Sequence, residues 1–145
     1  MKDQFKFFMK FVAILIIGFS SASCSTIELP NTSLDGVWSR GDIVITATGN
    51  NAVLTQINPN YRHLEAVNIG MISIGDQQIR NIRKTGNLVW AGEIGIIHYD
   101  TNSSGKITSY TGQSWADCII VMSENGKTIQ VTAEGYNPVN YTRVQ

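Results

Sequence analysis

The sequence predicts an all-β domain over residues 34–145, folded as a single antiparallel β-barrel of about eight strands. Three observations predict it. Short runs rich in β-branched residues follow one another closely, turn-forming residues separate them, and no stretch has a convincing helical period. A stretch of this length forms one domain. A β-sandwich is the alternative, because sandwiches and barrels share these sequence signals.

The predicted strands and turns alternate regularly along the domain. The strands cover residues 43–48, 52–57, 71–74, 79–83, 88–99, 119–123, 128–133 and 141–144. Gly49-Asn50-Asn51 predicts the first hairpin turn, and Asn125-Gly126 predicts a type I′ turn in the last, with positive φ at both central residues. Between strands, the loop 58–68 has room for a short helical turn.

The first 23 residues have a different character and predict a signal peptide. Lys2, Lys6 and Lys10 precede an apolar run at 11–19, and small residues lead to Cys24. The apolar run is well short of the roughly 20 residues that span a bilayer as a helix. All five Phe residues lie before Cys24 and none follows it. The chain is therefore expected to be cut at this point.

The cysteine at the cleavage point makes this segment resemble a bacterial lipoprotein signal. Ala22, Ser23 and Cys24 fit that pattern, whereas Ser21 stands where a large aliphatic residue is usual. The resemblance implies a lipid, such as palmitate, on Cys24 and a lipid-anchored protein of the cell envelope, at the outer membrane. Plain secretion, or release into the periplasm, is the alternative. Residues 24–33 would then be a lipidated tether, because they are small and polar and have no periodicity.

Cys118 is the second cysteine, and it lies in the apolar run 116–122. We expect it to be a buried thiol that packs as a small hydrophobic side chain. A disulfide between Cys24 and Cys118 would require that Cys24 is not acylated, so the two hypotheses exclude each other.

The two ends of the domain resemble the calycin group, which includes lipocalins, fatty-acid-binding proteins and avidins. Gly36-Val37-Trp38 matches the Gly-x-Trp start of that group, and Arg143 stands in the last strand. The resemblance implies that Trp38 closes one end of an up-and-down barrel and packs against Arg143 as a cation–π partner. Such a contact contributes roughly 0.5–2 kcal/mol.

Longer stretches resemble small uncharacterised lipoproteins of Bacteroidetes with a lipocalin-like β domain. They are Leu-Asp-Gly-Val-Trp at 34–38, the stretch 74–90 and Ser-Glu-Asn-Gly-Lys-Thr-Ile at 123–129. This resemblance implies an envelope location and a calycin-like fold, and it brings no known activity. Lipocalins usually fasten a barrel end with a disulfide, which an acylated Cys24 would not allow.

The sequence offers few candidate groups for catalysis or metal binding. Glu93, His98 and Asp100 fall on one strand and its exit, and we interpret them as surface polar residues. His63 lies in a polar loop and is expected to be solvated. Two isolated histidines do not form the set of three or four ligands that zinc requires. We therefore expect no catalytic residues, no metal and no cofactor, and we do not expect an enzyme.

The charge pattern also limits the partners. Charged residues after Cys24 are scattered and slightly acidic in sum, which argues against nucleic acid. Two functions are favoured: a module that binds a small hydrophobic ligand in the barrel, and a structural or assembly lipoprotein that contacts another envelope protein through its β-sheet surface. A hydrolase that uses Glu93, His98 and Asp100 ranks below both. A ligand-binding barrel should contain a cavity of roughly a few hundred Å³. The membrane, through the lipid on Cys24, is the other expected partner.

Overall fold

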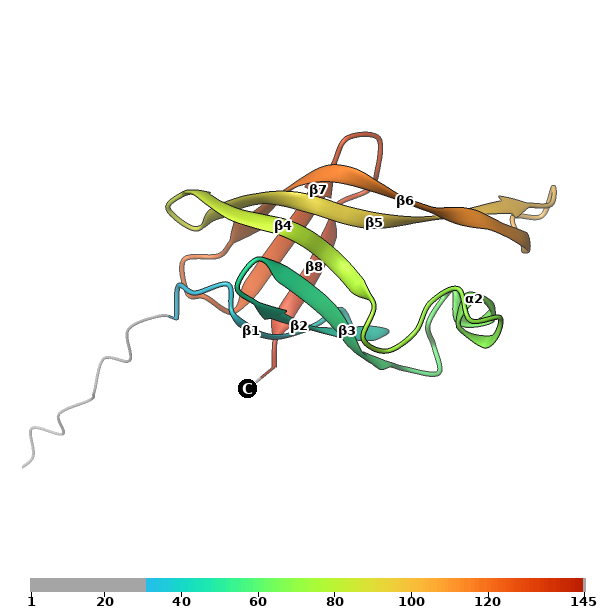
Figure 1. Cartoon of the computed structure of the whole chain (residues 1–145), viewed down its shortest axis with the longest axis horizontal. Helices are drawn as coiled ribbons and strands as arrows, with labels where there is room; N and C mark the ends of the chain where they lie inside the picture. Colours follow the sequence, from blue (N-terminus) through green and yellow to red (C-terminus); the bar gives the residue numbers. More distant parts are fainter. Residues whose placement is uncertain (1–30, 145) are drawn as a thin grey trace, which may run out of the picture.

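The computed structural model describes residues 31–144 and contains a closed barrel of eight antiparallel strands (Figure 1). Each strand pairs with its neighbours in sequence, and the first pairs with the last. The elements are β1 Gly36–Ser39, β2 Ile43–Thr48, β3 Asn51–Ile57, α2 Leu64–Asn68, β4 Gln77–Gly86, β5 Val89–Thr101, β6 Ile107–Met122, β7 Thr128–Ala133 and β8 Val139–Arg143. The predicted all-β barrel is confirmed, and the alternative sandwich is not the fold. The predicted signal segment, Cys24 and most of the tether lie outside the described residues.

The barrel core consists of inward-facing side chains from every strand. Alternation is clearest in β7, where each second residue is buried. The largest fully buried side chains are those of Trp38, Ile43, Ile45, Leu54, Ile79, Ile120 and Val131. Period-two alternation of this kind is how a strand places one face in a core and the other in water. These residues fill the barrel from the end that contains Trp38.

Glycines set the geometry of both predicted hairpins, but only one turn has the predicted form. Gly49 has a φ of 62° between β2 and β3, as expected for a glycine at the first central position of a two-residue turn. In the β6–β7 turn only Gly126 has positive φ, at 68°, so the predicted type I′ turn is wrong. The Gly126 N–H donates to the Ser123 carbonyl, so Glu124 and Asn125 are the central residues and Gly126 follows them. The loop has four residues, which relieves Asn125 of the left-handed conformation.

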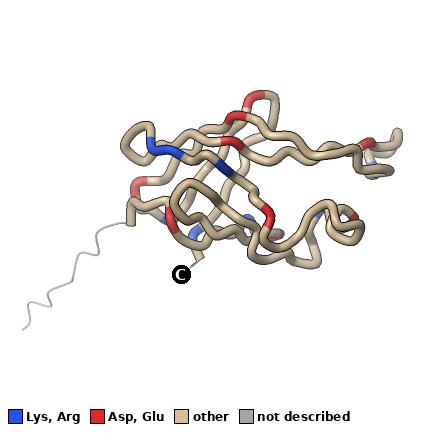
Figure 2. The backbone as a smooth tube through the Cα atoms, in the orientation of Figure 1, with Lys and Arg blue, Asp and Glu red and all other residues tan. Residues whose placement is uncertain are grey.

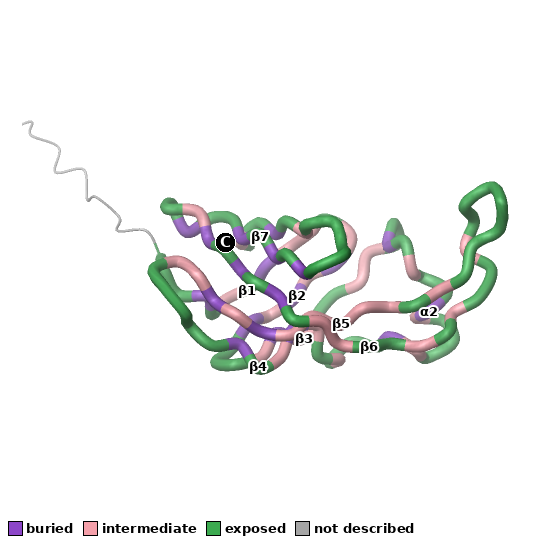
Figure 3. The backbone as a smooth tube through the Cα atoms, turned by 90° about the horizontal axis from the view of Figure 1, so that it is seen from above, coloured by how far each residue is buried: buried purple, intermediate pink, exposed green. Residues whose placement is uncertain are grey.

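The β5–β6 pair extends far beyond the barrel as a two-stranded ribbon (Figures 1 and 3). The β5–β6 pairing runs from Val89↔Val121 to Thr101↔Ile107. By contrast, β4 pairs with β5 only as far as Ile94, and β7 pairs with β6 only as far as Cys118. The sequence predicted only the end of β6, at 119–123. Its first part was missed because none of residues 107–117 is fully buried, and polar residues there do not alternate with apolar ones.

The segment between β3 and β4 crosses the barrel end from which the ribbon projects. It contains α2, which confirms the helical turn expected near loop 58–68. The strand predicted at 71–74 is wrong, because these residues form turns after α2. Ile72 is buried whereas Ile74 is 66% exposed, so the apolar run covers the barrel end with one side chain and does not enter the sheet.

Charged side chains are scattered over the described part of the chain (Figure 2). Two ion pairs occur there, Arg40–Asp42 and Arg80–Glu93, both partly exposed. Within residues 31–144, no helix has the length and apolar character needed to cross a membrane.

Candidate functional site

The two ends of the barrel differ, and one is closed by Trp38 and Arg143. Trp38 is fully buried, and its Nε1 donates to the Leu34 carbonyl at 2.9 Å. The Arg143 guanidinium carbon lies 4.1 Å from the centre of the Trp38 ring. Trp38 and Arg143 are also register partners in the β1–β8 pairing. The structure thus brings together the two residues that the calycin resemblance paired.

Three main-chain carbonyls hold the Arg143 side chain over the ring. Its Nε donates to Gly126 at 2.9 Å, its Nη1 to Asp35 at 2.9 Å and its Nη2 to Ser33 at 2.6 Å. Gly36 has a φ of 140°, and a Cβ there would lie 2.5 Å from Arg143 Nη1. The glycine of the Gly-x-Trp motif is therefore needed both for its backbone and for the space that Arg143 occupies. This end of the barrel is a structural plug.

The opposite end is covered by an aromatic cluster between the α2 segment and the ribbon. The His63 ring lies 5.0 Å from the Tyr99 ring, 5.5 Å from the Tyr61 ring and 6.1 Å from the Tyr110 ring. Arg62 also lies over Tyr99, at 5.4 Å. These contacts attach the α2 segment to the ribbon, which a two-stranded ribbon needs because it is only marginally stable alone.

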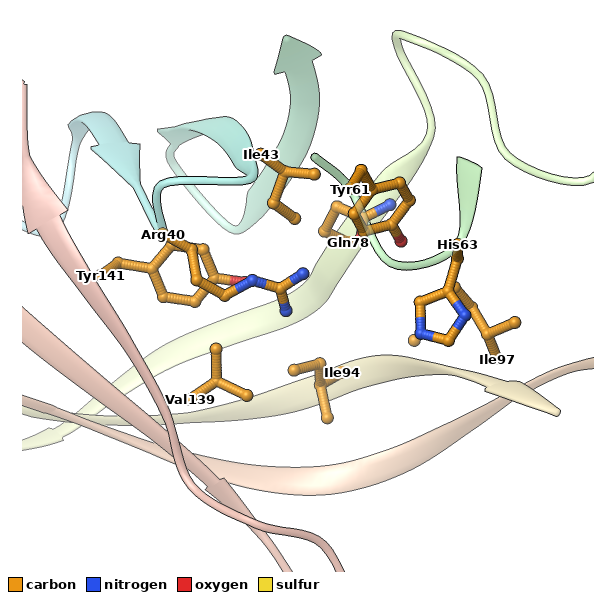
Figure 4. Close-up of a pocket in the computed structure, with 10 residues that line it drawn as sticks. Arg40, Ile43, Tyr61, His63, Gln78, Ile94, Ile97, Val139 and Tyr141 are labelled. Carbon is orange, nitrogen blue, oxygen red and sulfur yellow. The ribbon is translucent and has the colours of Figure 1, made fainter. Parts of the chain in front are cut away.

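A cavity of about 130 Å³ lies beneath this cover, inside the end of the barrel opposite Trp38, which we call the open end (Figure 4). Its walls combine polar and apolar side chains from six parts of the fold. They are Arg40, Ile43, Tyr61, His63, Gln78, Ile94, Gly95, Ile97, Val139 and Tyr141. The cavity is smaller than the few hundred Å³ expected for a complete ligand cup, because large side chains fill the rest of the barrel. Its volume is close to that of a cavity of about 150 Å³ that binds benzene.

Several polar groups on the cavity wall have no hydrogen-bond partner within residues 31–144. Arg40 uses Nε and Nη2 for Asp42, at 2.7 and 2.9 Å, and this leaves Nη1 free. The Tyr61 and Tyr141 hydroxyls and the Gln78 amide form no hydrogen bond in this part of the chain. In Figure 4, Tyr141 lies beside Arg40, and Tyr61 and Gln78 lie together on the side toward His63. Within the described chain, His63 Nδ1 is the only one of these side-chain atoms that is fully enclosed, so the other unpaired groups face a space that water or a ligand can reach.

His63 differs from its expected role as a solvated loop residue. It is half-buried, and its Nδ1 is enclosed without a hydrogen-bond partner in the described chain. Burial lowers its pKa, and the positive charges of Arg62 and Arg40 lower it further. The expectation was wrong because the loop folds back onto the ribbon, which a polar sequence alone does not reveal.

Burial moves the titration of the cavity phenols further above neutral pH. It raises the pKa of Tyr61 to about 12 and raises the pKa of Tyr141 as well. Both hydroxyls are therefore donors at neutral pH. The sequence did not single out Arg40, Tyr61 or Gln78, because only the barrel register brings them together.

A comparison of the chain with protein-family models, with curated proteins and with solved structures gave no match.

The polar residues considered for acid–base chemistry lie apart from this cavity. Glu93 accepts hydrogen bonds from Arg80 and Asn81 on the outside of the barrel. His98 Nε2 lies 2.6 Å from Ser114 Oγ on the ribbon, and Asp100 accepts from Ser109 at 2.7 Å. Within residues 31–144, no three His, Cys, Asp or Glu side chains are arranged to hold a metal ion.

Cys118 is a buried free thiol, as expected. It is 3% exposed, and burial raises its pKa to about 11. At neutral pH it is therefore a protonated core side chain and a poor nucleophile.

Proposed function

We propose that the protein is a lipid-anchored envelope protein without enzymatic activity, which binds a small molecule in the open end of its barrel. The observation that carries the binding proposal is the cavity, where unpaired polar groups of Arg40, Tyr61, Gln78 and Tyr141 meet apolar side chains. A concave, mostly preformed space with a few converging polar groups is the usual form of a ligand site.

The size and lining of the cavity define the ligand. Ile43, Ile94, Ile97 and Val139 supply apolar surface for the hydrophobic part of the molecule, and the polar groups fix its orientation. A cavity of about 130 Å³ encloses one ring-sized group. A larger ligand would place such a group in the cavity and leave its remainder at the mouth, near His63.

Native mass spectrometry of the protein purified from its natural host tests the binding proposal. We expect a co-purifying small molecule on the wild type, and a much lower occupancy in Ile97→Trp, because the larger ring would fill the cavity. Ile119→Trp is the control, since Ile119 is 54% exposed on the barrel exterior. The absence of any bound small molecule from both the wild type and Ile97→Trp would count against a binding module.

The anchoring proposal rests on the sequence around Cys24. Lysine-rich, apolar and small-residue segments lead to that cysteine in the order of a lipoprotein signal. We place the protein at the outer membrane on this ground, with release into the periplasm or secretion as the alternative. Labelled palmitate should enter the wild type and be absent from Cys24→Ala. Incorporation that survives in Cys24→Ala would overturn the assignment.

A second candidate function is a structural or assembly role through the β-sheet surface. Ile119 and Val121 are 54% and 46% exposed on the outer face of β6, next to Ala91 and Val89 of β5. A photocrosslinking residue at 119 should then join the protein to one envelope partner in cells. The same residue at Ser104, in the exposed turn at the tip of the β5–β6 ribbon, should not. Equal crosslinking from both positions would remove the case for this surface.

A further inference from the structure

The unpaired groups in the open-end cavity are mainly hydrogen-bond donors. Arg40 Nη1 offers two N–H groups, and the Tyr61 and Tyr141 hydroxyls each offer one. The Gln78 amide adds two N–H groups and the only carbonyl oxygen among these side chains. His63 Nδ1 donates in one of its neutral tautomers. A bound molecule that satisfies this wall must therefore be rich in acceptors.

The Arg40 guanidinium is held in place for such a contact. Asp42 binds it through two atoms, Nε and Nη2, and so fixes the plane of the guanidinium. The two side chains are 29% and 21% exposed, so the pair lies partly out of water, where charge interactions are screened less. Nη1 is the one guanidinium nitrogen that does not bind Asp42. In Figure 4 the guanidinium points into the space between Ile94 and Tyr61.

We infer that the cavity binds a small carboxylic acid as its carboxylate, with the two oxygens on Arg40 Nη1 and the Tyr61 and Tyr141 hydroxyls and the apolar body against Ile94, Ile97 and Val139. This inference rests on the proposed function and names the class of its ligand. A carboxylate accepts about four hydrogen bonds and donates none, which matches a wall of donors. Hydrogen bonds to a charged acceptor are also roughly twice as strong as neutral ones.

Asp42 is the charge that opposes this ligand. Its carboxylate neutralises Arg40 and would repel a second carboxylate at the far side of the guanidinium. The site is therefore tuned for weak, reversible binding. Removal of the Asp42 charge should strengthen the binding of an acid and leave the binding of a neutral analogue unchanged.

Benzoate and benzamide form a matched pair of probes, because they share a ring-sized body and differ in charge and in donor groups. We would titrate each into the isotope-labelled full-length protein and follow the amide resonances of residues 94–97 by NMR, at constant ionic strength. We expect benzoate to bind about tenfold more tightly than benzamide. Tyr141→Phe and Tyr61→Phe should each weaken benzoate about tenfold, since each removes one hydroxyl that donates to a charged oxygen. Tyr136→Phe is the control, because Tyr136 is 45% exposed and lies outside the cavity.

Asp42→Asn provides the second arm of the experiment. It should tighten benzoate several-fold without a matching change for benzamide. Equal affinities for the two probes, or tighter binding of benzamide, would overturn the carboxylate inference and leave the proposed binding function standing. Failure of both probes to shift the cavity resonances would count against both. Unchanged benzoate binding in Tyr141→Phe and Tyr61→Phe would also overturn the assignment of the site.

Discussion

The guanidinium of Arg143 stacks on the indole ring of Trp38 at 4.1 Å, and the same guanidinium binds three main-chain carbonyls. Arg143 comes from the last strand and Trp38 from the first, so the contact fastens the two strands whose pairing closes the barrel. That pairing is short, with two register partners, as is the pairing of β3 with β4. The side-chain contact therefore supplements a short main-chain seam.

Trp38→Ala should destabilise the protein by about 3–5 kcal/mol, because it empties the most buried large side chain of the plug. Urea unfolding monitored by circular dichroism measures this loss. Trp115→Ala is the matched control, since Trp115 is only half-buried and lies outside the barrel core, and it should cost clearly less. A loss below about 1 kcal/mol for Trp38→Ala would contradict the plug and the calycin analogy.

Gly36→Ala and Arg143→Met should be coupled. Arg143→Met removes the stack and three hydrogen bonds, at a cost of about 2–4 kcal/mol. Gly36→Ala pushes the guanidinium away from the same positions, so the double variant should lose less than the two single losses together. Arg83→Met, at an exposed arginine of β4, should be nearly neutral. Strict additivity in the double-mutant cycle would show that Gly36 does not act through Arg143.

Gly126→Val should cost about 3 kcal/mol or more, from a left-handed backbone and from a clash with the Asn31 main chain. Gly105→Val is the comparison, because Gly105 also has positive φ but has open space around it. It should show only the backbone strain, about 1–2 kcal/mol. Thermal unfolding of the two variants separates the contributions, and equal losses would mean that the Asn31 contact is unimportant.

His63 should make the folded state less stable in mild acid. Its pKa is lowered in the folded protein from an ordinary value of 6.5, so the unfolded chain takes up the proton first. Stability should therefore fall as the pH drops from about 7 to about 5.5, above the range where most carboxylates titrate. His63→Gln should lose this dependence, whereas His98→Gln, on the exposed ribbon, should keep it. An equally steep fall in His63→Gln would assign the effect to other groups.

The sequence predicted the barrel because most strands have one buried face and one solvent-exposed face. Ile43–Thr48 and Thr128–Ala133 were recognisable for this reason, and glycines marked their turns. The first part of β6 was not predicted, because no residue of Ile107–Asp117 is fully buried and the stretch has no alternation to detect. Met71–Ile74 was taken for a strand because a short apolar run looks alike whether it enters a sheet or covers its end.

The cavity residues were harder to predict than the fold. Arg40 and Tyr141 are 101 positions apart and meet only through the closure of the sheet between its first and last strands. A single polar residue in a loop gives no signal of such a meeting. The pairing of Trp38 with Arg143 came from a resemblance to a known group, and the structure places the two in contact.

The position of the first described residues relative to the cavity fixes how the protein would face its membrane. The main chain at Asn31 packs against Gly126, at the end of the barrel opposite α2 (Figure 1). Six residues lie between Cys24 and Asn31, so the chain between them reaches at most about 25 Å. On the proposed acylation of Cys24, the Trp38 plug would sit against the bilayer and the cavity mouth would open toward the aqueous compartment. Solutes would then reach the mouth by diffusion through water, and not by lateral transfer out of the lipid that holds the anchor.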